Sequence, residues 1–241
     1  MPTRKDLSEK KQRALSEFKS NNLEGARALE ICRRDKTDAD AWHMLSGING
    51  LLGLFEESGV CARKVIKLHP DFAGGHKNLG SALVMRGRIE EAKRSFLHAL
   101  RISPDDAESY SNLGSVCTRQ KNFDEAVGYC RKAIAIQDDR AEAHNNLGNA
   151  LLGLCQLNEA LTCFKRALQI RPDYFDAYFN MGKALQELGQ FDRALTCYQQ
   201  LLEVRPDYID TQVAVASILY EQVRLDEACK AYSQILDIRP G

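Results

Sequence analysis

The sequence predicts an all-α protein in which one helical hairpin is repeated to form a solenoid. Prolines stand at positions 70, 104, 172, 206 and 240, and every gap between them is 34 residues or twice that length. Asp138 takes the one missing position. Small residues and alanines return at the same interval. A strict period of this length indicates a helix–turn–helix unit copied along the chain.

Alignment on the prolines divides the chain into six copies. They span residues 39–72, 73–106, 107–140, 141–174, 175–208 and 209–241. Residues 1–38 are expected to form a degenerate, shorter copy that caps the array, with Ala26 in the place of a recurring alanine.

The first helix of each copy is predicted from a large residue in its fourth place, an apolar residue three positions later and a small residue directly after that. The fourth places are Trp42, His76, Tyr110, His144, Tyr178 and Gln212, and the small residues are Ser46, Gly80, Gly114, Gly148, Gly182 and Ala216. This spacing marks a helix face that another helix approaches closely. We therefore expect His76 and His144 to be structural and not metal ligands.

The second helix follows a break that often contains glycine. Polar residues near its start are expected to cap it, and they are Glu56, Glu90, Asp124, Asn158, Asp192 and Asp226. Capping is also expected for the acidic residues near the starts of the first helices, which are Asp40, Glu108, Glu142, Asp176 and Asp210. Alanine and an aromatic residue four positions later, as in Ala160 and Phe164, form the packing face of the second helix.

The composition argues against several classes of function. The formal net charge is zero, so no general attraction to nucleic acid or to an anionic membrane is expected. No stretch approaches the roughly 20 apolar residues of a membrane span. None of the eight cysteines forms a Cys-x-x-Cys pair, which is typical of buried thiols in a reducing compartment. We therefore expect a cytoplasmic, non-catalytic protein without a cofactor, a metal site, or nucleic-acid or membrane partners.

The order of aromatic, Leu-Gly, alanine, aromatic, alanine and proline within 34 residues resembles the tetratricopeptide repeat. The resemblance covers residues 39–241. It implies antiparallel helix pairs stacked into a right-handed superhelix with a concave groove. It also implies a scaffold that binds a peptide or protein segment in that groove.

The groove residues are expected on the side of the first helices that lies opposite the packing face, because successive residues turn by about 100°. The wall is mixed and mostly polar. The members that we single out are Lys77, Arg119, Asn145, Asn149, Phe179 and Lys183.

Asparagines recur at the edge of this wall in four successive copies, at Asn78, Asn112, Asn146 and Asn180. An amide offers two donors and an acceptor, so the row could bind the backbone of an extended peptide. It is similar to the asparagine ladder in the repeat arm of O-linked N-acetylglucosamine transferase, which implies a role in holding substrate peptide. Alternatively, the Asn-Leu-Gly motif packs neighbouring copies. We favour the packing interpretation, because a motif match alone is a hypothesis.

Two other functions remain open at this stage. The chain could be the substrate-recognition arm of a larger glycosyltransferase-like enzyme whose catalytic domain is not in this sequence. It could also be an assembly module, because the last copy is expected to leave Tyr232, Leu236 and Ile238 uncovered. That end would then belong to a fragment of a longer protein or support self-association.

Overall fold

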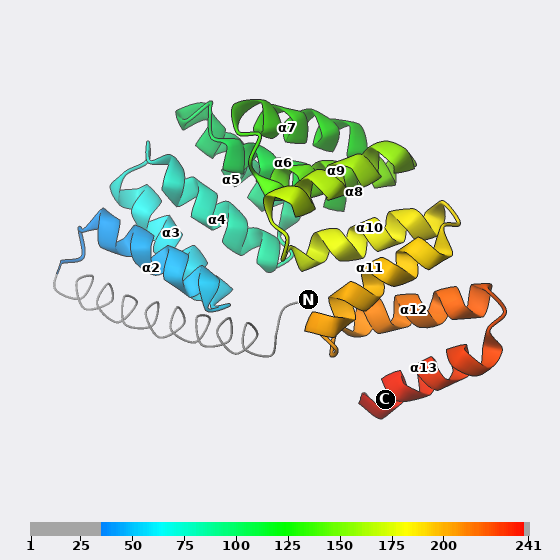
Figure 1. Ribbon diagram of the computed structural model, residues 1–241. Coiled ribbons are helices and arrows are strands. Elements are labelled where there is room, and N and C mark those ends of the chain that lie inside the picture. Colours follow the sequence, from blue (N-terminus) through cyan, green and yellow to red (C-terminus); the bar gives the residue numbers. More distant parts are fainter. Residues whose placement is uncertain (1–34, 239–241) are drawn as a thin grey trace. The chain divides into compact units, whose positions relative to one another are not determined.

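The computed structural model describes residues 35–238, and within them every regular element is an α-helix and none is a strand (Figure 1). The helices are α2 (Ala39–Leu51), α3 (Phe55–Leu68), α4 (Ala73–Met85), α5 (Ile89–Ile102), α6 (Ala107–Arg119), α7 (Phe123–Ile136), α8 (Ala141–Gly153), α9 (Leu157–Ile170), α10 (Phe175–Glu187), α11 (Phe191–Val204), α12 (Ile209–Glu221) and α13 (Leu225–Ile238). The predicted all-α repeat fold is confirmed. The degenerate copy around Ala26 lies outside the described residues. None of the described helices combines the length and apolar character that a bilayer span requires.

The chain divides into two compact units, and the boundary in the sequence falls within α6, between Asn112 and Leu113. In the described part of unit 1, residues 35–112, α3 packs against α2 and α4, and α4 packs against α5. In the described part of unit 2, residues 113–238, successive helices from α7 to α13 pack side by side. The first helices α8, α10 and α12 also touch in sequence.

The small residue of the first helix leaves space for an aromatic ring of the second helix. A Cβ atom added to Gly148 would lie 2.5 Å from the Phe164 ring, and one added to Gly182 would lie 2.4 Å from the Tyr198 ring. Both rings are fully buried. The close helix approach predicted from the spacing is therefore present within the repeated hairpins.

The fourth-place side chains fasten the turn that precedes each first helix. Four of them place a nitrogen near the carbonyl oxygen six residues earlier. The pairs are Trp42 with Lys36 at 3.2 Å, His76 with Pro70 at 3.0 Å, His144 with Asp138 at 2.9 Å and Gln212 with Pro206 at 2.6 Å. Because a carbonyl oxygen only accepts, the side-chain nitrogen is the donor in each pair. In these four copies the fourth-place side chain therefore supplies a donor as well as bulk.

The acidic residues near the starts of the second helices do not cap them as the sequence pattern predicted. Leu54, Arg88, Asn122, Gln156 and Gln190 are the N-cap residues of α3, α5, α7, α9 and α11, and they make no side-chain cap bond. The predicted caps, such as Glu56 and Asp192, lie inside the first turn. Their charge there favours the positive end of the helix dipole.

The break between paired helices needs a left-handed residue. Gly53, Gly87 and Gly189 have φ values of +76°, +71° and +70°. Lys121, Cys155 and Val223 adopt the same conformation at φ near +60°. A non-glycine residue there costs about 1–2 kcal/mol, so these three turns carry strain that the rest of the hairpin offsets.

Candidate functional site

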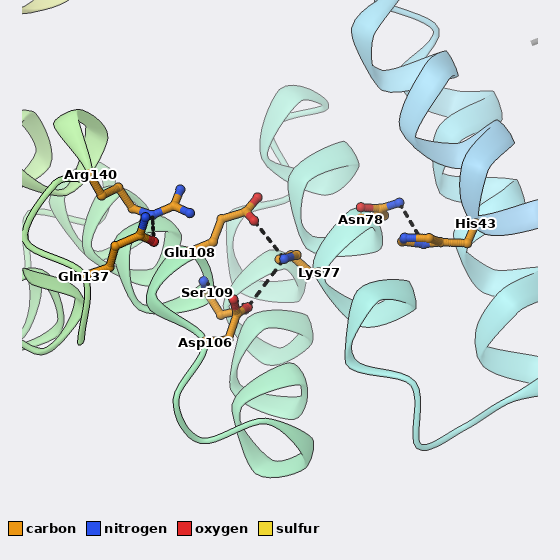
Figure 2. A network of polar contacts seen from close by, with 8 residues as sticks. All are labelled: His43, Lys77, Asn78, Asp106, Glu108, Ser109, Gln137 and Arg140. Carbon is orange, nitrogen blue, oxygen red and sulfur yellow. Dashed lines mark hydrogen bonds and ion pairs between the residues drawn. The ribbon is translucent and has the colours of Figure 1, made fainter. Parts of the chain in front are cut away.

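The polar face of unit 1 is held together by its own side chains (Figure 2). The Lys77 ammonium lies 2.7 Å from Glu108 and 3.7 Å from Asp106, and the Asn78 amide lies 3.3 Å from the His43 ring. The pair of carboxylates offsets the charge of Lys77. Glu108 was expected to be a helix cap and is instead the ion-pair partner of Lys77. Asp106 also accepts a 3.3 Å hydrogen bond from the Ser109 backbone N–H.

Unit 2 contains a hollow of about 720 Å³ that gathers most of the predicted groove residues, and we call it the unit-2 groove. Its lining is Ser115, Thr118, Arg119, Asn145, Asn146, Asn149, Leu152, Gly153, Tyr174, Asp176, Phe179, Asn180, Lys183, Glu187 and Tyr208. Seven of the ten predicted residues are therefore brought together here. Lys77 and Asn78 line a separate hollow in unit 1, and Asn112 lines neither.

The groove asparagines are linked along the row of first helices. Asn180 on α10 donates to the Asn145 carbonyl oxygen on α8 at 3.1 Å. The Asn145 amide in turn lies 3.5 Å from the Tyr174 hydroxyl. Asn78 and His43 form the corresponding pair in unit 1. Part of the asparagine row thus ties neighbouring copies, as the packing interpretation predicts, while each amide keeps further donor and acceptor capacity.

Aromatic side chains from the turns between copies complete the groove. Arg171 lies 4.0 Å from the centre of the Tyr174 ring and donates to Glu142 at 2.7 Å. Glu142 was expected to be a cap and is instead the partner of Arg171. Burial above all raises the pKa of Tyr174 to about 12, so its hydroxyl stays protonated near neutral pH.

The floor of the groove is a small aromatic cluster. The Phe179 ring centre lies 5.9 Å from those of Tyr198 and Tyr208, and the Tyr208 contact is edge-to-face. Sequence reasoning missed Tyr174 and Tyr208. A periodic signal for them exists, because Phe72, Tyr174 and Tyr208 each stand two residues after a proline.

Within residues 35–238 no cluster of three or more histidine, cysteine or acidic side chains is arranged to hold a metal ion. Burial raises the pKa of the Cys130 thiol to about 12, which removes it as a thiolate nucleophile near neutral pH. The groove offers amides, rings and a few charges.

The histidines of unit 1 give a prediction for pH dependence. Burial is the main cause that lowers the pKa values of His43 and His76 below their ordinary value of 6.5. The unfolded chain therefore binds more protons than the folded chain below that pH, and stability should fall as the pH drops from about 7.5 toward 5.5. Urea denaturation at several pH values measures this slope.

A matched variant uses residues that the chain itself carries in equivalent places. His43→Asn copies Asn145, and His76→Gln copies the donor of Gln212. The free energy of unfolding of the double variant should change less between these pH values than that of the unmodified chain. An unchanged slope would assign the pH dependence to other groups.

Comparisons with known proteins agree with this architecture. A family model described as Tetratricopeptide repeat matches residues 71–139, 105–173 and 139–207, and a second model with the same description matches residues 179–241. No curated protein sequence matches the chain significantly.

Solved structures share the fold at low sequence identity. A chain of the APC/C hetero-tetramer Cut9–Hcn1 is 18% identical with a TM-score of 0.85; the match covers 92% of this chain and 44% of that one. Pseudomonas aeruginosa pilF is 20% identical with a TM-score of 0.70, covering 86% and 94%. YrrB, described as a TPR protein with an unusual peptide-binding site, is 22% identical with a TM-score of 0.55, covering 78% and 96%. At these identities the likeness shows the fold alone. The glycosyltransferase-arm and assembly alternatives find no support in these comparisons.

Proposed function

The chain belongs to the tetratricopeptide repeat family, and on this premise we propose that it is a non-catalytic scaffold whose unit-2 groove binds an extended peptide or protein segment. The observation that carries the proposal is the convergence of seven groove residues, predicted from their places in different copies, on one hollow of about 720 Å³. A hollow of this size accommodates a few residues of an extended chain.

The amides suit a peptide backbone. Asn146, Asn149 and Asn180 stand half-buried along α8 and α10 and line the groove. Each residue of an extended peptide carries one donor and one acceptor, and an asparagine side chain can satisfy both. The hydrogen bond from Asn180 to Asn145 uses one amide N–H and fixes the orientation of the other.

The rings and charges supply the rest of the recognition surface. Phe179 is half-buried and held by Tyr208, so it offers a preorganised apolar surface to a partner side chain. Lys183 is exposed at the groove and forms no ion pair with another described residue. The cytoplasmic location and the absence of nucleic-acid and membrane partners stay predictions from composition.

A peptide selection tests the proposal. Random 12-residue peptides displayed on phage would be selected on the unmodified chain, and their affinities measured by calorimetry. The double variant Asn149→Ala and Asn180→Ala should weaken binding by about tenfold or more, because each lost hydrogen bond contributes about 0.5–1.5 kcal/mol.

The matched control is Asn158→Ala, an exposed asparagine on α9 outside the groove. It should leave affinity within about twofold. Equal affinity of the selected peptides for the double variant, with unchanged helical content, would place their binding elsewhere. A selection that yields no binding peptide would also count against the proposal.

A further inference from the structure

Unit 2 has a second hollow, of about 540 Å³, whose lining comes from α7, α8 and α9 and the turn after α7. We call it the α7–α9 hollow. Its apolar lining includes Ile134, Leu147 and Cys163, and its charged lining is Arg131, Lys165 and Arg166 with Asp138. On α8, at 100° per residue, the mean direction of His144 and Leu147 is turned by roughly 180° from the mean direction of Asn145, Asn146 and Asn149. The hollow therefore lies on the side of α8 away from the unit-2 groove.

The repeat itself explains why the space is there. His144 stands where two other copies carry Tyr110 and Tyr178. In unit 1 the equivalent His76 is covered by the ring of His98, stacked at 4.0 Å. The residue equivalent to His98 is Arg166, which has no aromatic ring to stack on His144. Its guanidinium instead binds the Asp138 carboxylate at 2.7 Å. A smaller fourth-place ring and a missing covering ring together leave volume between α7 and α9.

The replacement of proline by aspartate is part of the same arrangement. At Asp138 the backbone carbonyl accepts from His144 at 2.9 Å, as the proline carbonyls do elsewhere. The carboxylate is additional, and it holds Arg166 at the edge of the hollow. The turn is therefore preserved while a charged edge is gained.

The charges of the edge are cationic in sum. Arg131 and Lys165 are exposed and form no ion pair with another described residue, whereas Arg166 is paired with Asp138. Burial is the main cause that raises the pKa of Cys163 to about 11. The Cys163 thiol in the lining of the hollow is therefore uncharged near neutral pH. An occupant that matches both parts has an apolar side chain for the interior and carboxylates for the edge.

We propose that the α7–α9 hollow is a second docking site, which binds an acidic protein segment through apolar side chains flanked by carboxylates. This site is independent of the unit-2 groove, so the scaffold can hold two segments at once. Neither the family match nor the fold likeness assigns a site to this face.

The probe is the unlabelled peptide acetyl-Asp-Glu-Leu-Phe-Asp-Glu-amide, titrated into the ¹⁵N-labelled chain and followed by NMR. Shift changes are expected to gather at α7, α9 and the turn at Asp138. Two companion peptides, with lysines for the acidic residues or Gly-Ser for Leu-Phe, should bind at least tenfold more weakly. Octanoate, titrated separately, should not reproduce the shifts with equal affinity.

Two variants test whether the probe binds in the hollow, and one control tests whether a change in net charge alone weakens binding. His144→Tyr inserts the ring that the chain carries at Tyr178, and it should weaken probe binding at least tenfold while helical content stays unchanged. Arg131→Glu with Lys165→Glu should do the same by reversing the edge. Arg193→Glu with Lys230→Glu changes the net charge equally at two exposed residues that line neither the hollow nor the unit-2 groove, and it should leave affinity within twofold.

Several results would overturn the proposal. They are no shift at millimolar probe, equal binding by the Gly-Ser peptide or by octanoate, shifts gathered at the unit-2 groove, or loss of binding in the control double variant. If His144→Tyr fails to fold, full binding by the folded Arg131→Glu and Lys165→Glu variant would overturn it instead. Loss of groove binding in Asn149→Ala with Asn180→Ala leaves this test unaffected, so the two proposals fail separately.

Discussion

Replacing Phe164 by alanine is expected to lower the free energy of unfolding by about 3–5 kcal/mol, the range for a fully buried phenylalanine. Phe164 is 0% exposed and packs in the main core of unit 2, with Ala160 of its own helix and Leu147 of α8. Truncation removes the ring from this core and leaves a cavity that rigid helices fill only in part.

Urea denaturation followed by circular dichroism measures this loss. Lys165→Ala is the matched control, because Lys165 is the exposed neighbour of Phe164 on the same helix, and it should stay within about 0.5 kcal/mol. A loss below about 1 kcal/mol for Phe164→Ala would contradict the core assignment.

A methyl group added opposite the same ring is expected to cause the second large loss in the free energy of unfolding. Gly148→Ala should cost about 1–3 kcal/mol, because its Cβ would lie 2.5 Å from the Phe164 ring and overpacks the hairpin. The cost is the reverse of ordinary helix propensity, in which alanine is favoured over glycine by about 1 kcal/mol.

Two companion variants isolate the cause. Gly128→Ala lies within α7, where the new Cβ meets nothing within 4 Å, so it should stabilise the chain by about 0.5–1 kcal/mol. In the background of Phe164→Ala the cost of Gly148→Ala should disappear, which gives a coupling energy of at least about 1 kcal/mol. Additive effects would show that the ring and the glycine do not meet.

The architecture could be predicted from the sequence because the repeat imposes the same demand six times. Proline positions, small residues such as Gly148 and rings such as Phe164 recur at fixed places, and each recurrence supports the others. The left-handed turn at Gly53, Gly87 and Gly189 could also be predicted, since glycine adopts this conformation readily.

Side-chain partners between copies could not be predicted, because they depend on how the hairpins stack. Glu108 and Glu142 looked like caps and are ion-pair partners of Lys77 and Arg171. The asparagine row was singled out, yet the hydrogen bond from Asn180 to Asn145 follows only from the contact between α8 and α10. Long charged side chains reach across several angstroms, so spacing along one helix does not determine their partners.

Part of the predicted set is not gathered in one place. Lys77 and Asn78 belong to unit 1, where nearby side chains already engage them. Tyr232 and Leu236, expected to be uncovered, are 40% and 65% exposed on α13; the Ile238 side chain is not among those described. Self-association through this face stays a prediction.

Photo-crosslinking from inside the unit-2 groove tests the central claim most directly. The photoreactive analogue p-benzoylphenylalanine would replace Phe179, and in a separate variant Leu236, before illumination with a selected peptide. We predict a peptide adduct from position 179 and none from position 236, with mass spectrometry locating the linked residue. An adduct from position 236 alone would contradict binding in the groove.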